Sequence, residues 1–450
     1  MNSKNKFSPI HLMTGNHINV IYDEHSMNLF KVNNRTYEIV KALKSGISLT
    51  EISKEHLCSE KQIIKLLESL QGEEATYQTS SERIIERITL HVSNDCNLRC
   101  KYCYANGGSY NQNRSLMSLK VAEDFIDFCS KNFDSVEYIV FFGGEPLLNV
   151  PIMSYICTEF SKRYANGLVK FMPKFGMITN GTILNDNIIN FIRDNLSFVT
   201  VSIDGIGKDN DANRIFANGK GSYLKIHSFI HSLKTKTPVN IRYEATYTQY
   251  HIEKGLSTWD ISKAIENEFG ITGDVIEELS VQQHTNVDFW HDFSFEKWKQ
   301  EGSYIFPEGF WSILNAINQK RPKLMCGIAH TIFAVATNGD IYPCHINTGE
   351  PSNRLGNISD ANIFNSSEIK QEYFPVNIEY NEVCNSCWAN KICGGCSRTW
   401  FYDEKKEIYL LYPKQELCEK NKRHLENILL LIAAARSDAT VWKNITKKKS

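Results

Sequence analysis

Residues 90–106 read LHVSNDCNLRCKYCYAN, and this stretch holds three thiols in a C-x3-C-x2-C pattern, namely Cys96, Cys100 and Cys103. The run just before them, ITLHV at 88–92, is short, apolar and β-branched, which predicts a buried strand. In α/β folds, ligands bind beyond the carboxyl ends of the strands. We therefore expect the three thiols in a loop at the ligand-binding edge of a sheet.

The number of thiols in this loop indicates an iron–sulfur cluster with one open iron. Clusters are held by Cys thiolates, and a cubane with three protein ligands leaves one iron for a ligand that is not protein. A zinc knuckle is the alternative, although zinc usually takes four ligands from paired spacings. The chain has 13 cysteines and no recognisable signal peptide, which favours metal or redox chemistry in a reducing compartment over disulfides.

Length and composition narrow the class of protein. A chain of 450 residues exceeds the size at which single cores stop growing, so two or three domains are expected. The formal net charge of -1 gives no general attraction to nucleic acid or to an anionic membrane. The longest apolar run, at 428–435, is too short to span a bilayer and predicts the buried face of a C-terminal helix. We expect a cytoplasmic enzyme with no nucleic-acid or membrane partner.

Strands alternate with helices from Ile84 to about Ile271, which predicts βαβ units and a parallel sheet. One predicted strand, at 138–142, runs directly into the motif Gly143, Gly144, Glu145 and Pro146. Because glycine has no side chain, this turn permits a close approach between the backbone and a ligand. Such a turn is common by itself, and its place one βα unit after the cysteine loop makes it informative.

Polar residues follow the next two predicted strands as well. Asn180 ends one of them, and the strand at 198–203 brings Ser202 and Asp204 to the same edge of the sheet if side chains alternate. Arg214 lies in the loop that follows. Two alternatives stay open here, because Asp204 would also suit the cap of the following turn and Arg214 would suit a surface ion pair.

The cysteine spacing, with the aromatic Tyr102 just before the last thiol, resembles that of the radical S-adenosylmethionine (SAM) enzymes. The resemblance implies that Cys96, Cys100 and Cys103 hold a [4Fe-4S] cluster whose open iron takes the amino and carboxylate groups of SAM. It also implies that the GGEP motif contacts the methionine amino group and that Arg214 clamps the carboxylate. The expected cofactor-binding residues are Tyr102, Gly143, Gly144, Glu145, Pro146, Asn180, Ser202, Asp204 and Arg214.

A second array of thiols follows, at Cys326, Cys344, Cys384, Cys387, Cys393, Cys396 and Cys418, and residues 337–340 (TNGD) predict a hairpin turn within it. The array resembles the SPASM extension of radical SAM enzymes, although its last spacing is one residue shorter than the commonest form. The resemblance implies an outer auxiliary [4Fe-4S] cluster on Cys384, Cys387, Cys393 and Cys418. It implies an inner cluster on Cys326, Cys344 and Cys396, with a fourth position open or closed by a distant side chain. Two zinc sites are the alternative.

Residues 1–75 show a different pattern from the rest of the chain. Short runs that alternate between apolar and polar residues, at 18–22 and 28–32, precede three predicted helical segments. The third segment opens with Ser59 and Gln62, which fit a capping box. The arrangement resembles a small winged-helix domain of the kind that recognises precursor peptides, in which the leader adds as a strand to a sheet edge. DNA binding would need a basic face, yet lysines and glutamates balance in these helices. A purely structural cap is the other alternative.

Together these features predict an α/β fold: a partial (β/α)6 TIM-type barrel with an N-terminal winged-helix-like peptide-recognition domain and a C-terminal Cys-rich SPASM domain. The expected ranges are 1–75 for peptide recognition, 84–320 for the radical SAM barrel, 321–425 for SPASM, and 426–450 for a C-terminal helix and tail.

The resemblance implies three [4Fe-4S] clusters, SAM, and an external electron donor such as flavodoxin or ferredoxin. The expected activity is that of a radical SAM peptide maturase that joins a Cys sulfur to a carbon of a ribosomally made precursor peptide, through a 5′-deoxyadenosyl radical. An anaerobic sulfatase-maturing activity is one alternative, although His345 follows Cys344 where that family leads us to expect an Asp base. Carbon–carbon crosslinking of a peptide is another. A redox-sensing DNA regulator would need the basic face that residues 1–75 lack.

Overall fold

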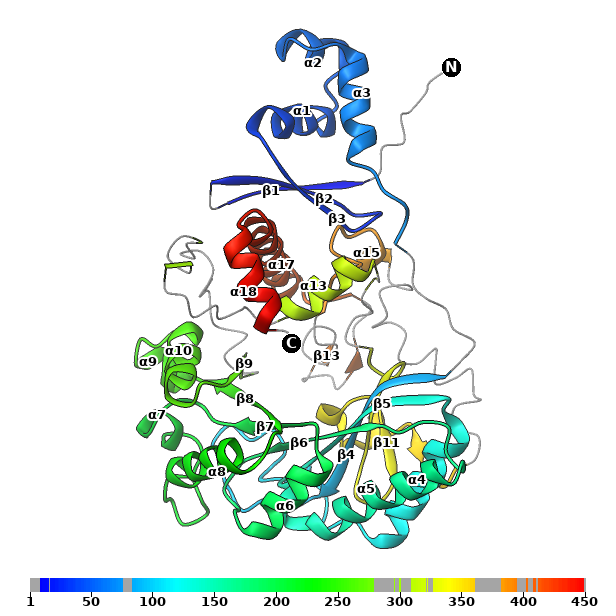
Figure 1. Ribbon diagram of the computed structural model, residues 1–450, viewed down its shortest axis with the longest axis vertical. Coiled ribbons are helices and arrows are strands. Elements are labelled where there is room, and N and C mark those ends of the chain that lie inside the picture. Colours follow the sequence, from blue (N-terminus) through cyan, green and yellow to red (C-terminus); the bar gives the residue numbers. More distant parts are fainter. Residues whose placement is uncertain are drawn as a thin grey trace. The chain divides into compact units, whose positions relative to one another are not determined.

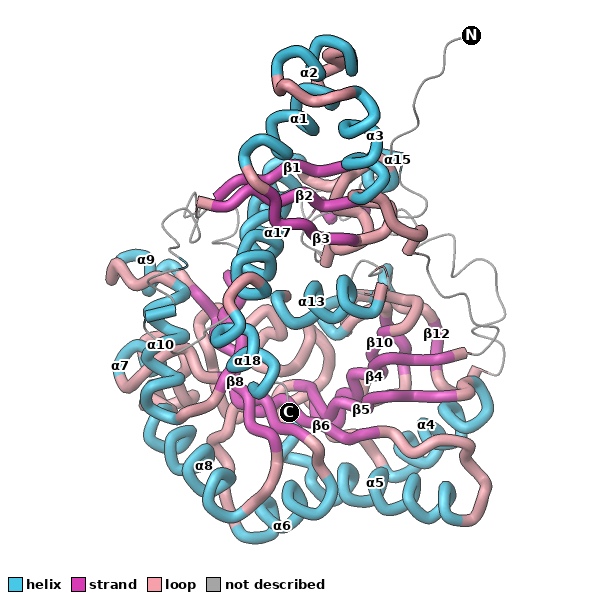
Figure 2. Tube along the Cα trace, turned by 45° about the horizontal axis from the view of Figure 1, so that its top comes forward, coloured by secondary structure: helices cyan, strands magenta, loops and turns pink. Residues whose placement is uncertain are grey.

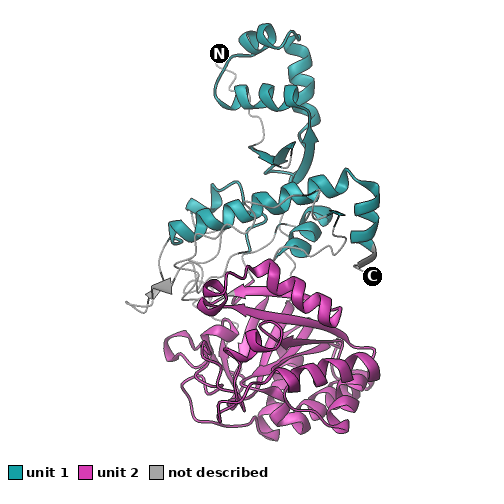
Figure 3. Ribbon diagram, turned by 90° about the vertical axis from the view of Figure 1, so that its left-hand side faces the viewer, with its two compact units in different colours: residues 1–79, 288–326, 375–450 teal, residues 80–287, 327–374 magenta. Residues whose placement is uncertain are grey.

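The computed structural model describes the chain in stretches, namely residues 9–15, 17–75, 83–278, 295, 299–300, 309–320, 322, 327–360, 382–394, 402–403, 408–409 and 412–448. The chain divides into two compact units (Figure 3). Unit 1 comprises residues 1–79, 288–326 and 375–450, and unit 2 comprises residues 80–287 and 327–374. The four domain ranges expected from the sequence divide the chain in another way and stay a prediction.

Unit 2 is built on a sheet whose described strands run in the order β12-β11-β10-β4-β5-β6-β7-β8-β9. From β4 to β9 each strand is parallel to its neighbour, which confirms the expected α/β fold with a partial barrel. These strands are β4 (Ile84–Ser93), β5 (Ser135–Gly143), β6 (Lys174–Thr179), β7 (Phe198–Ser202), β8 (Asn240–Tyr247) and β9 (Thr272–Glu277).

Three shorter strands extend the sheet beyond β4. β10 (Ile332–Val335) pairs with β4 in parallel, and β11 (Asp340–Tyr342) and β12 (Gly356–Asn357) continue antiparallel. The predicted turn at 337–340 joins β10 to β11, and its Gly339 adopts φ +86°, which glycine tolerates without strain. Short 3-10 turns follow at η2 (His345–Asn347) and η3 (Pro351–Asn353).

Helices cover one face of this sheet (Figures 1 and 2). They are α4 (Leu119–Asn132), α5 (Val150–Ala165), α6 (Asp186–Asn195), α7 (Lys208–Asp211), α8 (Tyr223–Lys236), α9 (Gln249–Glu253) and α10 (Thr258–Phe269), with the turn η1 (Pro146–Asn149) before α5. Helix starts follow the sequence, since Ser118 accepts a hydrogen bond from the Val121 amide and Asn185 accepts one from the Ile188 amide. Apolar side chains between helices and strands form one continuous core.

The other face of the sheet is more polar because side chains alternate along each strand. In β4, Leu90 belongs to the apolar core, whereas its neighbours Thr89 and His91 are buried without belonging to it. Ser202 ends β7 in register with Glu244 of β8. This polar face therefore leads to the carboxyl ends of the strands, where the cysteine loop begins.

The strand β9 was not located by the sequence, because it begins at Thr272, just where the predicted alternation of strands and helices ends. Its sequence, TGDVIE, contains a glycine and two acidic residues, all of which are uncommon in strands. A Cβ atom at Gly273 would lie 2.0 Å from the carbonyl oxygen of Tyr243 in β8, so only glycine allows this close pairing. The identity of β9 thus depends on its neighbour and not on its own propensity.

Unit 1 begins with an antiparallel sheet of order β1-β2-β3, followed by three helices. Their bounds are β1 (Ile10–Gly15), β2 (Ile18–Asp23), β3 (Asn28–Val32), α1 (Asn34–Lys44), α2 (Leu49–Glu55) and α3 (Glu60–Ser69). The predicted capping box of Ser59 with Gln62 is confirmed. Apolar residues of β2 and the helices form a small core around Ile21 and Ile52. The order of strands then helices agrees with the sequence, and the winged-helix assignment stays a prediction.

The remaining elements of unit 1 come from later in the chain. They are α13 (Phe310–Gln319), α15 (Glu382–Asn385), β13 (Tyr402–Asp403), β14 (Ile408–Tyr409), α17 (Gln415–Arg436) and α18 (Ala439–Lys448). Helix α17 packs on β1, β2 and β3 and buries the apolar run 428–435, as predicted. Among the described residues, no helix has the length and hydrophobicity needed to cross a membrane.

Candidate cofactor site at the strand ends

The cysteine loop begins directly after β4 and is hydrogen-bonded to the turn that follows β5. The Gly144 amide donates to the Ser93 carbonyl at 2.8 Å, and the Glu145 amide donates to the Asp95 carbonyl at 2.9 Å. The hydroxyl of Tyr110, at the far end of the same loop, donates to the Gly143 carbonyl at 3.0 Å. The GGEP turn therefore holds the loop in place through its own backbone groups.

The two glycines of this turn are required for space. A Cβ atom at Gly143 would lie 2.1 Å from the Ser93 carbonyl oxygen, and one at Gly144 would lie 2.4 Å from that of Asp95. Gly143 also has φ +128°, a conformation that other residues rarely adopt. The sequence suggested that these glycines admit a ligand, and the structure shows that the cysteine loop itself uses the space at their missing side chains.

Glu145 is fully buried and is held by three donors. Its carboxylate accepts hydrogen bonds from the Leu147 amide (3.0 Å), the Thr179 hydroxyl (2.6 Å) and the Asn180 amide (2.8 Å). Burial raises the pKa of Glu145, while these hydrogen bonds oppose the increase. The side chain thus ties the turn after β5 to the end of β6. Pro146 follows it, buried at the start of η1.

Asn180 links the end of β6 to the first thiol. Its Nδ2 donates to Cys96 Sγ at 3.6 Å and to Asn97 Oδ1 at 2.9 Å, while its Oδ1 accepts from the Thr182 hydroxyl at 2.6 Å. The Leu98 amide also donates to Cys96 Sγ, at 3.4 Å. Hydrogen bonds to a ligating sulfur tune the reduction potential of an iron–sulfur cluster. The sequence placed Asn180 at the site but did not find its partners Asn97 and Thr182.

The loop that follows β7 supports the cysteine loop from another side. The Arg99 amide donates to the Ile215 carbonyl at 2.7 Å, and the Lys101 amide donates to the Asn213 carbonyl at 3.1 Å. The ends of β5, β6 and β7 therefore all contact the segment that carries the three thiols. This confirms that the segment lies at the carboxyl edge of the sheet.

Tyr102, Asp204 and Arg214 form a buried cluster beside the thiols. The Tyr102 hydroxyl donates to Asp204 Oδ2 at 2.6 Å and accepts a hydrogen bond from the Arg214 guanidinium. Asp204 Oδ1 accepts from the Thr246 amide at 2.9 Å and lies 3.6 Å from Arg214 Nη1. Asp204 is therefore more than the cap of a turn, and the surface ion pair considered for Arg214 is wrong because its side chain is only 9% exposed.

The Arg214 guanidinium keeps one donor free within the described structure. Its Nε is buried and has no hydrogen-bond partner there. Buried donors are nearly always paired, so an anionic group from a ligand is expected at this position. A carboxylate such as that of SAM would satisfy it. The residues present thus fit the cofactor that the sequence resemblance implies.

The buried thiols suit a metal in the same way. Burial, with a further contribution from the Glu145 carboxylate, raises the pKa of Cys96 to about 12. Burial also raises the pKa of Cys100, whereas the Arg214 cation lowers it. A thiol that coordinates a metal loses its proton, so bound iron would stabilise the thiolate form that burial otherwise disfavours. Cys103 lies in the same loop, its amide bonded to the Cys100 carbonyl at 3.2 Å.

Among the described residues, no three His, Cys, Asp or Glu side chains converge on one point as the ligands of one ion would. A cubane cluster does not need such convergence because each thiolate binds a different iron. The donor set of Cys96, Cys100 and Cys103 is therefore compatible with a cluster.

Aromatic rings continue from the cysteine loop across the polar face of the sheet. The His91 ring lies 4.7 Å from that of Tyr110 and 5.3 Å from that of Phe142, and Phe142 lies 5.1 Å from His345. Cys344 Sγ is 3.4 Å from His345 Nδ1. Burial, with a smaller effect of His345, lowers the pKa of His91 to about 3. The sequence did not single out His91 or Tyr110, although a histidine inside an apolar strand was a usable signal.

The second cysteine array is divided between the two units. Cys384, Cys387, Cys393 and Cys418 belong to unit 1, and Cys344 belongs to unit 2. Burial, then the nearby Cys418 and Cys387, raises the pKa of Cys384 to about 11, so three of these sulfurs are close together. Asn421, one turn after Cys418, donates to Cys393 Sγ at 3.6 Å. The expected inner-cluster ligands Cys326 and Cys396 lie outside the described residues.

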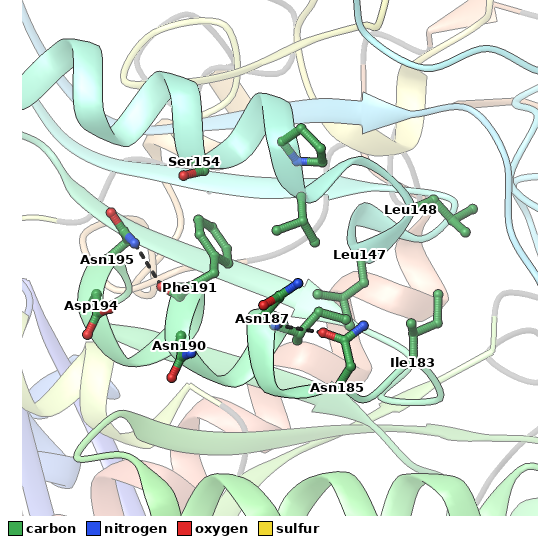
Figure 4. A pocket seen from close by; sticks show the side chains of 13 residues that line it. Leu147, Leu148, Ser154, Ile183, Asn185, Asn187, Asn190, Phe191, Asp194 and Asn195 are labelled. Carbon is green, nitrogen blue, oxygen red and sulfur yellow. Dashed lines mark hydrogen bonds between the residues drawn. The ribbon is translucent and has the colours of Figure 1, made fainter.

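A pocket of about 550 Å³ lies between η1, α5 and α6 (Figure 4). Four asparagines line it together with apolar side chains such as Leu147 and Phe191. These helices cover the opposite face of the sheet from the polar side chains, so the pocket is not the cofactor site. The candidate cofactor site is instead at the cysteine loop, where the buried Arg214 from the loop after β7 contacts Tyr102 beside the thiols.

Two family models match the chain. Residues 90–245 match the radical SAM superfamily, and residues 326–388 match SPASM, an iron-sulfur cluster-binding domain. An uncharacterized protein of Methanocaldococcus jannaschii is 30% identical over 301 residues, which cover 64% of this chain and 94% of that protein. The chain belongs to the radical SAM superfamily and carries a SPASM domain.

Relatives with named activities are more distant. The cysteine-type anaerobic sulfatase-maturating enzyme of Clostridium perfringens strain 13 is 24% identical over 359 residues, covering 74% of this chain and 94% of the enzyme. The radical SAM cyclopropyl synthase TigE of Paramaledivibacter caminithermalis is 22% identical over 475 residues, covering 93% of this chain and 96% of TigE. The solved structure of native anSMEcpe with bound AdoMet has a TM-score of 0.61 at 21% identity, covering 77% of this chain and 99% of that chain, and shares the fold.

Proposed function

We propose that this radical SAM enzyme is a peptide maturase that oxidatively crosslinks a ribosomally made precursor, joining a Cys sulfur to a carbon. The observation that carries the proposal is the small sheet β1-β2-β3 with α1 to α3, placed ahead of the cysteine loop. A three-stranded sheet with open edges can accept an extended peptide as a further strand. The similarity to TigE, which extends over 93% of this chain, supports a function that uses these residues.

The residues of the cysteine loop bind and orient the cofactors in this proposal. Cys96, Cys100 and Cys103 hold the cluster, and Arg214 donates to the SAM carboxylate while Tyr102 and Asp204 fix its guanidinium. Bound there, cluster and SAM supply an electron and a 5′-deoxyadenosyl radical that takes a hydrogen atom from the peptide. Glu145 and Asp204, which hold the surrounding residues in place, are themselves fully buried and shielded from water.

Formation of the crosslink oxidises the peptide, so each hydrogen atom, proton and electron that leaves the peptide must have an acceptor. One C–H bond and one S–H bond of the peptide break, and one C–S bond forms. A bound SAM would supply the radical that removes one hydrogen atom, the thiol proton would leave to solvent or a base, and a bound auxiliary iron–sulfur centre would accept the remaining electron. Cys344 and the four thiols Cys384, Cys387, Cys393 and Cys418 belong to the array proposed to hold these centres.

Mass spectrometry of the peptide tests the proposal. A candidate Cys-containing precursor peptide, sought among the neighbouring reading frames, would be incubated anaerobically with cluster-loaded enzyme, SAM and reductant, and its thiols would then be alkylated. We expect a loss of two hydrogens per event, with one thiol per event becoming unreactive. Deoxyadenosine formation without any change in this peptide would contradict it as the substrate, and oxidation of a sulfatase-derived peptide instead would favour sulfatase maturation.

Carbon–carbon bond formation is the second candidate, because TigE, whose similarity extends over 93% of this chain, is named a cyclopropyl synthase. The same experiment separates the two candidates. A loss of two hydrogens with every thiol still reactive would favour a bond between carbons. Fragmentation of the product would then locate the joined residues.

A further inference from the structure

The loop that carries three of the proposed outer-cluster ligands also contacts the N-terminal sheet. Residues 384–393 include Cys384, Cys387 and Cys393, and the side chains of Trp388 and Lys391 extend from the same loop. The loop and the sheet both belong to unit 1. Their contacts are therefore internal to one compact body.

Trp388 directly follows Cys387 and packs on two strands. Its ring is stacked on that of His11 in β1, with centroids 3.8 Å apart and planes inclined by 7°. The Tyr22 ring of β2 meets it edge-on, at 6.3 Å and 76°. His11 is in turn bound to helix α17, because its Nε2 lies 2.7 Å from Glu426 Oε1. Aromatic pairs of this geometry contribute beyond the area they bury.

Lys391 makes a second connection, to the backbone of the turn between β2 and β3 and to the backbone after α3. Its ammonium donates to the His25 carbonyl at 2.8 Å and to the Ala75 carbonyl at 2.7 Å. Lys391 is 9% exposed, so the two carbonyls and the Glu74 carboxylate 3.7 Å away replace its hydration. Hydrogen bonds of a buried charge are costly to break, because the charge is then left without partners.

Helix α17, which begins with Cys418 in its first turn, covers the same sheet. A Cβ atom at Gly15 of β1 would lie 2.8 Å from the Leu430 side chain, so helix and strand are in close contact. The fourth proposed outer-cluster ligand thus stands on the helix that packs on β1 to β3. Both the loop and the helix that converge on the cluster reach the peptide-recognition domain.

We propose that Trp388 and Lys391 are positioning residues, through which the outer-cluster loop anchors the N-terminal domain within unit 1, and that productive delivery of a bound precursor needs this anchoring. Cys387 and Cys393 bracket both residues, so a cluster bound to these thiols fixes the loop that presents them. The inference rests on the proposed function, because it takes residues 1–75 as the site of leader binding. The outer cluster then has a mechanical role in addition to electron transfer.

The consequence concerns effective concentration. A leader bound to the domain makes the reaction of the core peptide intramolecular, so that reaction within the complex replaces a second encounter. If the domain is loosened, leader binding itself is unchanged and productive delivery of the core becomes rarer. A short core peptide without the leader does not use this route.

The variant Lys391→Met tests this, with Lys61→Met as the matched control on the exposed face of α3. Both would be studied as full-length, cluster-loaded protein with equal iron content. We expect amide deuterium exchange at residues 10–25 to become at least about tenfold faster in Lys391→Met only, from the loss of two charged hydrogen bonds. The affinity for the fluorescein-labelled candidate precursor, the same peptide as in the mass-spectrometry experiment, should stay within about twofold.

Turnover with two substrates completes the test. For the full precursor we expect kcat to fall about tenfold in Lys391→Met, while kcat/KM for the leaderless core peptide is unchanged. Trp388→Ala should behave alike, and Trp388→Phe should recover part of the loss through a smaller stacked ring. An equal loss with both substrates, or no loss at all, would overturn the inference.

Removal of the iron–sulfur clusters tests whether the outer cluster helps the loop to anchor the N-terminal domain. We expect chelator-treated wild-type protein to show faster exchange at residues 10–25 than loaded protein, and equal exchange would overturn the role of the cluster. If labelled precursor does not bind wild-type protein, leader recognition by residues 1–75 is wrong. The exchange measurements would then still decide whether the loop anchors the domain.

Discussion

The Tyr102 hydroxyl donates a 2.6 Å hydrogen bond to the Asp204 carboxylate, although the two residues are 102 positions apart in the chain. Tyr102 stands between the second and third thiols, and Asp204 follows β7. The same hydroxyl accepts from Arg214, whose Nε is the buried donor assigned to SAM. One phenol therefore joins the cysteine loop to the residues that would hold the cofactor carboxylate.

Replacing Tyr102 by Phe should weaken SAM binding. The variant removes a hydrogen bond to a buried carboxylate, an interaction worth about 1.5–3 kcal/mol, and frees the Arg214 side chain. We expect the SAM dissociation constant of cluster-loaded protein to rise about tenfold or more, with unchanged iron content. Tyr164→Phe, at an exposed tyrosine, is the control. Unaltered SAM affinity in Tyr102→Phe would show that this cluster of side chains does not position the cofactor.

Replacing Gly144 by Ala should prevent assembly of the first cluster. The new Cβ atom would lie 2.4 Å from the Asp95 carbonyl oxygen, so the cysteine loop must move. We expect about four fewer iron atoms per chain after reconstitution, measured by iron and sulfide analysis. Gly219→Ala controls for the substitution itself, because a Cβ there meets nothing within 4 Å and only its φ of +80° is unfavourable. Full iron content in Gly144→Ala would contradict the space argument.

Replacing Asn180 by Ala should lower the reduction potential of the first cluster. The Nδ2 hydrogen bond to Cys96 Sγ stabilises the extra negative charge of the reduced cluster, so its loss favours the oxidised form. A hydrogen bond worth about 1 kcal/mol corresponds to a shift on the order of 40 mV. Potentiometric titration followed by electron paramagnetic resonance measures the shift. Asn190→Ala, at an exposed position of α6, should leave the potential unchanged, and the idea fails if both variants behave alike.

Replacing His91 by Phe should make stability less dependent on pH. The folded-state pKa of His91 lies near 3, below its ordinary value of 6.5, so the unfolded chain binds the proton first. Its stabilising contribution is therefore complete above pH 6.5 and is lost as the pH falls towards 3. Between pH 6.5 and 5.5 the variant should lose about 1 kcal/mol less unfolding free energy than the wild type. Urea unfolding at both pH values measures this, with the exposed His231→Phe as control.

The local part of the site could be predicted from the sequence. The thiol spacing, the GGEP turn and the polar residues after β6 and β7 are short patterns, and parallel strands bring their carboxyl ends to one edge. The structure brings Asn180, Glu145 and Asp204 together there. The spacing of residues along the sequence does not show which hydrogen-bond partner each polar group has in the folded chain. The GGEP sequence predicts a backbone that approaches a ligand, whereas in the structure the Gly144 amide donates to the Ser93 carbonyl.

Contacts between distant segments could not be predicted. No periodicity relates Trp388 to His11, or Lys391 to the carbonyls of His25 and Ala75, because these pairs meet only in the folded chain. Strand β9 was not predicted for a related reason, since Gly273 suits a strand only where the Tyr243 backbone approaches so closely. Propensity describes a residue by itself, whereas these features depend on the neighbour.

The packing of α17 on the first three strands also governs the order in which the chain can fold. His11 and its partner Glu426 are 415 positions apart, so at usual rates of synthesis roughly 20 to 80 s separate their emergence from the ribosome. During this interval, one face of the sheet β1-β2-β3 has no helix to cover it. Nascent chains should therefore need protection at this surface, and expression at lower synthesis rates would lengthen the exposure and not shorten it.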